Sequence, residues 1–247
     1  LYTAKMLEYL ERGRHTDKPF FAYVAYTTPH APLQAPISLI DAYTDHYLEL
    51  GYEGLKRARF ESQKRHGILP PDAEYPTEGG NPLVRQWSEL GEEERVRQAR
   101  MMATYSAMME SQDFHIGLML NYLRETGQLD NTLVVYLSDN GPEGLDVTGA
   151  LSNAKATEWI TAHFSQALED IGAGNAFGFI GTSWANAATG GLQWWKWFIG
   201  EGGVRVPLII RPPTDQPFAH QGDKTNAFAS VKDIPMTILD YAGVTHP

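Results

Sequence analysis

The sequence of 247 residues contains no cysteine. Disulfide bonds, thiolate metal ligands and cysteine nucleophiles are therefore excluded from this chain. The absence of cysteine does not distinguish cytoplasm from periplasm, because a chain without thiols is stable in reducing and oxidising compartments alike. The sequence leaves its localisation unknown.

Basic residues and long apolar runs are also scarce. Twenty Lys and Arg stand against 30 Asp and Glu, a formal charge of -10, which argues against a nucleic-acid partner because phosphate backbones require clustered cations. No segment approaches the run of about 20 apolar residues that a membrane helix needs, and no signal-peptide pattern opens the chain. The 43% hydrophobic content nevertheless suffices for a core, so we expect a globular domain, with no membrane association, that meets any anionic substrate through a local positive patch.

Two segments carry helical periodicity. Residues 1–14 place Met6, Leu7 and Leu10 on one face without an N-cap before them, which indicates a chain that begins inside a domain. Residues 92–126 form the clearest predicted helix, ended by Gly127. Its apolar residues recur at spacings of three and four: Met101, Tyr105, Met108, Met109, Ile116, Met119, Leu120 and Leu123. Residues 38–90 are charged and interrupted by proline, so we expect a surface excursion that is only locally helical.

Three short apolar runs are typical of buried strands: residues 20–26, 131–138 and 206–211. Helices that alternate with unbroken hydrophobic strands predict an α/β fold with a mostly parallel sheet covered on both faces. Open sheets of this kind bind ligands at the carboxyl ends of their strands. The residues that follow the first two runs are therefore the first candidates for a site.

Polar side chains follow both of these strand ends. His30 lies between Pro29 and Pro32 in a stiff loop, where it could donate a hydrogen bond to an anion or protonate a leaving oxygen. It could equally be a histidine packed under a turn. Asp139 and Asn140 offer two adjacent hard oxygen donors that suit Ca²⁺ or Mg²⁺, although an Asn-Gly pair is also a common tight turn.

Lys196 lies among tryptophans, in the run Gln-Trp-Trp-Lys-Trp-Phe at residues 193–198. A surface lysine stacked on indole faces is one interpretation. In the other, the aromatic rings exclude water and strengthen the ammonium charge against a sulfuryl or phosphoryl oxygen. Residues 201–207, Glu-Gly-Gly-Val-Arg-Val-Pro, indicate a tight turn that enters a strand and has a structural role.

Taken in order, these motifs resemble the type I sulfatases, most of all bacterial arylsulfatases. The resemblance is carried by Lys18-Pro19-Phe20-Phe21, Pro29-His30-Ala31-Pro32, Asp113, Leu129-Asp130-Asn131-Thr132, Ser138-Asp139-Asn140-Gly141, Lys196 and the Glu201-Gly202-Gly203-Val204-Arg205-Val206-Pro207 segment. It covers nearly the whole chain and preserves the order of the motifs.

The resemblance implies an alkaline-phosphatase-like fold, with a mostly parallel sheet between helices that is incomplete at the N-terminal side of a partial catalytic domain, residues 1–247. It implies that Asp139 and Asn140 are two metal ligands, for Ca²⁺ rather than Mg²⁺. His30 and Lys196 would contact the sulfate group of a small sulfate ester, with His30 as the candidate acid for the leaving oxygen.

The family's nucleophile is a formylglycine made from a Cys or Ser in a Cys/Ser-x-Pro/Ala-x-Arg motif, and this sequence contains no such motif. Two further acidic metal ligands of the family, near its amino terminus, also have no counterpart here. We therefore expect the isolated chain to be inactive. Sheet edges left exposed by missing strands would allow self-association.

Two alternatives remain open at this point. A phosphonate or phosphodiester hydrolase of the same superfamily shares the Asp-Asn-Gly and His elements. A non-catalytic module could instead use the aromatic cluster around Trp194 to hold a ring-bearing ligand.

Overall fold

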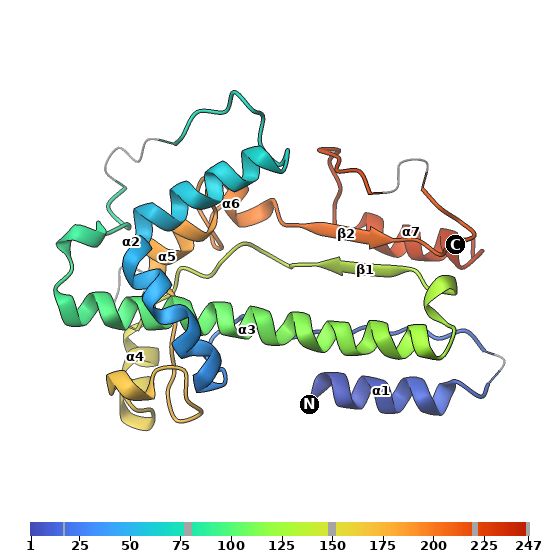
Figure 1. The fold of residues 1–247 in the computed structure, drawn as a ribbon, viewed down its shortest axis with the longest axis horizontal. Coiled ribbons are helices and arrows are strands. Elements are labelled where there is room, and N and C mark those ends of the chain that lie inside the picture. The colour runs from blue at the N-terminus through green and yellow to red at the C-terminus, as the bar shows by residue number, and fades with distance from the viewer. Residues whose placement is uncertain (17, 77–80, 148–151, 219–221, 246–247) are drawn as a thin grey trace.

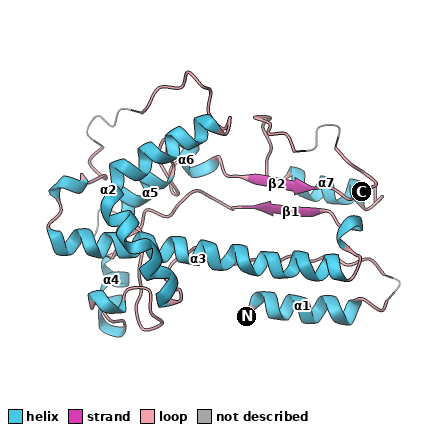
Figure 2. Cartoon of the chain, in the orientation of Figure 1, coloured by secondary structure: helices cyan, strands magenta, loops and turns pink. Residues whose placement is uncertain are grey.

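The computed structural model describes residues 1–247 except 17, 77–80, 148–151, 219–221 and 246–247. Its elements are helices α1 (Tyr2–Gly13), α2 (Ile37–Arg65) and α3 (Glu92–Glu125), strand β1 (Val134–Leu137), helices α4 (Ala154–His163), α5 (Gly181–Ala188) and α6 (Glu201–Val204), strand β2 (Leu208–Arg211) and helix α7 (Asp233–Tyr241). Short 3-10 turns lie at Trp87–Glu89, Leu129–Asn131 and Leu168–Asp170. The fold is mixed α/β, as the sequence predicts (Figure 2).

Helix α3 is the central element, with α2 packed on its first half and α1 alongside its second half (Figure 1). Three glutamates occupy its first turn, where the helix dipole favours negative charge. It stops before Gly127, whose φ of 70° lies in the left-handed region that glycine adopts without strain. Both predicted helices, α1 and α3, are therefore confirmed to within a residue of their expected ends.

The main core lies where α2, α3 and α5 meet. Trp184 of α5 is fully buried, and its ring centroid lies 5.7 Å from that of Tyr47, 4.6 Å from that of Tyr52 and 5.5 Å from that of Trp87. Its indole nitrogen donates to the Gln98 carbonyl of α3 at 2.8 Å. This packing anchors α5, and with it the start of the segment that leads to Lys196.

Helix α2 corrects the expectation for residues 38–90. Instead of a locally helical surface excursion, the structure has a helix of 29 residues, kinked at Gly51, that contributes Ile40, Tyr47 and Tyr52 to the core. Gly51 has a φ of 62°, and a Cβ there would lie 2.7 Å from the Trp87 ring. The kink shifts the phase of the apolar pattern halfway along the helix, which hides a single period of 3.6 residues.

The sheet also differs from the prediction. Strands β1 and β2 pair antiparallel, with Val134 opposite Arg211 and Leu137 opposite Leu208. Residues 20–26 are not a strand but run without ladder partners, and Phe21 and Tyr23 are 73% and 78% exposed. A strand exists only when a neighbour satisfies its backbone groups, and the part of the chain that the structure describes supplies none here. The predicted parallel sheet is therefore wrong for these residues.

Helix length and hydropathy also bear on the membrane question. Among the described residues, no helix is both long and apolar enough to cross a membrane.

Candidate active site

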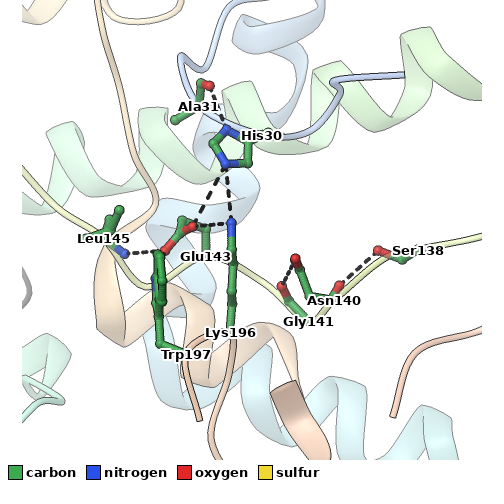
Figure 3. A network of polar contacts seen from close by, with 9 residues as sticks. All are labelled: His30, Ala31, Ser138, Asn140, Gly141, Glu143, Leu145, Lys196 and Trp197. Carbon is green, nitrogen blue, oxygen red and sulfur yellow. Dashed lines mark hydrogen bonds and ion pairs between the residues drawn. The ribbon is translucent and has the colours of Figure 1, made fainter. Parts of the chain in front are cut away.

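The candidate site is built from three loops: the one around His30, the one that follows β1, and the one between α5 and α6 (Figure 3). They are distant in sequence, since His30 and Lys196 are separated by 166 positions. Their meeting is a property of the tertiary structure alone.

Glycine contacts hold two of these loops together. The Gly141 N–H donates to the Gly203 carbonyl at 2.9 Å, and a Cβ on Gly141 would lie 1.9 Å from the Gly202 carbonyl oxygen. A Cβ on Gly202 would in turn lie 1.9 Å from the Trp194 carbonyl oxygen. The backbone of α6 thus fits between the loop after β1 and the loop of Lys196 only because both motifs carry glycine. The tight turn expected at residues 201–207 is instead the short helix α6, which leads into β2.

The His30 ring has one nitrogen fixed by the backbone. Its Nδ1 lies 2.8 Å from the Ala31 carbonyl oxygen. A carbonyl can only accept, so Nδ1 carries a proton and donates. The Nε2 atom is left to face the site, 3.3 Å from Lys196 Nζ, while the side chain remains 56% exposed.

Lys196 and Glu143 form a close ion pair. Lys196 Nζ lies 2.6 Å from Glu143 Oε2, with the two side chains only 19% and 11% exposed. Glu143 Oε2 also lies 4.0 Å from His30 Nε2, so one carboxylate faces both predicted sulfate-binding groups (Figure 3). The Lys196 N–H donates to the Pro142 carbonyl at 3.0 Å, which ties the lysine backbone to the same loop.

Glu143 is itself held from the other side. Its Oε1 accepts a hydrogen bond from Trp197 Nε1 at 2.5 Å and another from the Leu145 N–H at 3.2 Å. The Trp197 ring centroid lies 5.4 Å from Lys196 Nζ, within reach of a cation-π contact. Reasoning from the sequence did not single out Glu143; its only local signal is a carboxylate three residues after the predicted ligand Asn140.

The tryptophans around Lys196 adopt an unusual backbone. Trp194 and Trp197 have φ values of 65° and 83°, a region that costs a non-glycine residue about 1–3 kcal/mol and often marks functional loops. Between them, Trp195 is fully buried and a Cβ on Gly144 would lie 2.1 Å from its indole nitrogen. Of the aromatic residues expected around Lys196, the exposed Trp197 contacts its ammonium group, while Trp195 anchors the loop in the core.

The predicted metal ligands lie on the same loop as Glu143. Asn140 is half-buried; its Nδ2 donates to the Gly141 carbonyl and its own carbonyl accepts from Ser138 Oγ, both at 2.9 Å. Asp139 is exposed. In Figure 3, no dashed line joins Asn140 to His30 or Lys196.

The donor chemistry of this pair fits part of a calcium site. A carboxylate and an amide oxygen are ligands that Ca²⁺ accepts, but the ion takes six to eight oxygens. Within the described ranges, no group of three or more His, Cys, Asp or Glu residues could hold a metal ion. Asp139 and Asn140 can therefore supply two ligands of a site and not a whole one.

A depression elsewhere on the molecule is a weaker candidate for binding an anion. It has a volume of about 360 Å³ and is lined by residues that include Arg124, Asp130 and Arg211. Arg211 donates to Asp130 at 3.2 Å and to the Leu129 carbonyl at 2.7 Å. Because the Arg211 guanidinium already donates to the Asp130 carboxylate and the Leu129 carbonyl, less of its positive charge is available to a ligand in this depression.

Comparison with known proteins adds the family. The sulfatase family model matches residues 1–244. The chain belongs to the sulfatase family. Over its whole length, this sulfatase chain is 38% identical to an uncharacterized sulfatase of Schizosaccharomyces pombe, covering 43% of that protein. It is 29% identical to an arylsulfatase of Klebsiella aerogenes over 92% of the chain and 47% of the relative.

Two further similarities concern the superfamily and the fold. The sulfatase chain is 30% identical over its full length to a multifunctional alkaline phosphatase superfamily protein of Trinickia caryophylli, covering 38% of it. The crystal structure of Ps i-CgsB in complex with k-i-k-neocarrahexaose matches all of the chain and 34% of the solved one, with a TM-score of 0.51 at 20% identity. This likeness shows a shared fold. The chain spans less than half the length of each of these relatives.

Proposed function

We propose that the sulfatase domain containing these residues hydrolyses sulfate monoesters, with His30 and Lys196 as the groups of this chain that contact the sulfate. The observation that carries the proposal is the distance of 3.3 Å between Lys196 Nζ and His30 Nε2 in a chain of the sulfatase family. An anion oxygen that approaches the two atoms from the side would be within hydrogen-bond reach of both.

Each group has a definite task in this proposal. The partly buried Lys196 ammonium stabilises negative charge on the transferred sulfuryl group, because water is largely excluded from it. His30 acts in its doubly protonated form: Nδ1 continues to donate to the Ala31 carbonyl, while the Nε2 proton passes to the leaving oxygen as the sulfur–oxygen bond breaks. The leaving group departs as a neutral alcohol or phenol, the imidazole is left neutral, and the sulfuryl group passes to a nucleophile that lies outside these residues.

Asp139 and Asn140 are proposed as two ligands of a calcium ion, with the remaining ligands outside this sequence. When bound, such an ion supplies Lewis-acid stabilisation of the sulfuryl oxygens. The nucleophile is proposed to be a formylglycine, also outside these residues, because no Cys or suitable Ser motif is present. The 247-residue chain supplied with calcium and a chromogenic aryl sulfate should then show no turnover.

Binding to the isolated chain tests the anion site directly. Phenyl sulfate is titrated against the 247-residue chain while the tryptophan indole N–H signals are followed by NMR. We expect Lys196→Ala to abolish saturable binding and Lys155→Ala, which removes the same charge from α4, to leave it intact. No Lys196-dependent binding would refute the assignment.

Two alternatives are separated by related measurements. A module that holds ring-bearing ligands through Trp194 predicts the reverse pattern, in which Trp194→Ala abolishes binding of phenyl sulfate and Lys196→Ala does not. A phosphonate or phosphodiester hydrolase of the alkaline phosphatase superfamily, the superfamily named for one relative, would be recognised in the full-length protein. There a phosphonate monoester or phosphodiester should be turned over faster than the matching sulfate ester.

A further inference from the structure

Glu143 places a negative charge inside the proposed anion site. Its Oε2 lies 2.6 Å from Lys196 Nζ and 4.0 Å from His30 Nε2. The side chain is 11% exposed and cannot easily turn away, because Trp197 and the Leu145 N–H both hold its other oxygen. The Lys196 ammonium group is therefore paired with a carboxylate that lies inside the proposed site.

This carboxylate lies close to any anion that Lys196 binds. An anion oxygen hydrogen-bonded to Lys196 Nζ lies about 3 Å from that atom, and Nζ lies 2.6 Å from Glu143 Oε2. The bound oxygen is therefore within about 6 Å of the carboxylate, which is shorter than the Debye length of about 8 Å at physiological salt. Salt does not screen the repulsion between them fully.

The repulsion grows with the charge on the ligand. A sulfate monoester carries one negative charge, as do a phosphodiester and a phosphonate monoester, whereas a phosphate monoester above its second pKa of about 6 carries nearly two. Each ligand gains attraction from Lys196 and loses part of it to Glu143. Without Glu143, the second charge of a phosphate monoester would meet a lysine that has lost its ion pair with this carboxylate.

We propose that Glu143 is a specificity-determining residue that makes this site select singly charged esters and disfavour phosphate monoesters. The inference rests on the proposed anion site at His30 and Lys196. It is compatible with a sulfate monoester hydrolase and with a phosphonate or phosphodiester hydrolase, because the substrates of both carry a single negative charge at the reacting group.

Two ligands that differ in charge but little in shape test this inference. Phenyl sulfate and phenyl phosphate are titrated against the 247-residue chain at pH 8 in the presence of EDTA, so that only the charges of the chain act on them. The measured quantity is the ratio of the Kd for phenyl phosphate to the Kd for phenyl sulfate. We expect Glu143→Gln to lower this ratio about tenfold, between the limits that Coulomb's law gives for bulk water and for a protein surface at this separation.

Matched variants separate charge from packing. Glu8→Gln removes one charge from an exposed position on α1 and should leave the ratio unchanged. Trp197→Phe removes the hydrogen bond to Glu143 but keeps its charge, so the ratio should change less than in Glu143→Gln. Glu143→Ala should lower the ratio in the same direction, and it replaces the Gln variant if that protein does not fold.

The outcomes distinguish this proposal from the one it rests on. Lys196-dependent binding with a ratio that Glu143→Gln and Glu143→Ala leave unchanged would overturn the role of Glu143 and leave the anion site standing. Failure of the unmodified chain to bind either ligand through Lys196 would overturn both.

Discussion

Gly141 provides the sharpest test of how the site is assembled. In Gly141→Ala, the new Cβ would lie 1.9 Å from the Gly202 carbonyl oxygen and 3.1 Å from the Gly203 Cα. Both neighbours are backbone atoms, so no side-chain rotation relieves the contact. The loop after β1 and the start of α6 must move apart by about 1 Å or more to restore an ordinary van der Waals separation.

The cost follows from two contributions. Overpacking in a well-packed region costs about 1–3 kcal/mol, and loss of the hydrogen bond from the Gly141 N–H to the Gly203 carbonyl adds about 0.5–1.5 kcal/mol. We therefore expect the free energy of unfolding to fall by about 1.5–4.5 kcal/mol. Affinity for phenyl sulfate should fall as well, because the displaced loop after β1 no longer holds the Lys196 backbone through the Pro142 carbonyl and so loosens Lys196 from its position beside His30.

Urea unfolding followed by tryptophan fluorescence measures the first effect, and Gly117→Ala is its control. Gly117 lies inside α3, where a Cβ would meet nothing within 4 Å, so alanine should stabilise the protein by about 0.5–1 kcal/mol through helix propensity. The reasoning would be refuted if Gly141→Ala unfolded within about 0.5 kcal/mol of the unmodified chain.

Three further predictions concern stability. Burial lowers the pKa of Lys56 from 10.5 to about 8; between these values the unfolded chain binds more protons, so stability should rise with pH over this window. Relative to Lys56→Met, the rise should be on the order of 2 kcal/mol, and parallel pH profiles of the two proteins in urea would contradict it. Trp184→Ala should cost about 3–5 kcal/mol in urea unfolding because the ring is fully buried; a loss below about 1 kcal/mol would argue against its central place in the core. Asn153 caps α4 by accepting from the backbone N–H groups of Lys155 and Ala156, so Asn153→Ala should cost about 1 kcal/mol while Asn153→Asp should not. Equal losses in both variants would speak against the cap.

Local patterns in the sequence were enough for the parts of the fold that depend on neighbours along the chain. The apolar spacing of α3 and the glycine after it predict that helix and its end, and apolar runs predict β1 and β2 to within a few residues. Helix α2 was not predicted, because the kink at Gly51 shifts the spacing of its apolar residues halfway along the helix. Residues 20–26 have the composition of a strand, but strand formation requires partners that composition does not provide.

The candidate site divides in the same way. Motifs and their order identified His30, Lys196, Asp139 and Asn140 as candidates, because the type of a residue and its position after a predicted strand can both be read from the sequence. Only the tertiary structure brought His30 Nε2 to 3.3 Å from Lys196 Nζ and placed Glu143 against both. Charge pairing depends on distances of a few ångströms between loops far apart in the chain, and no local pattern encodes those distances.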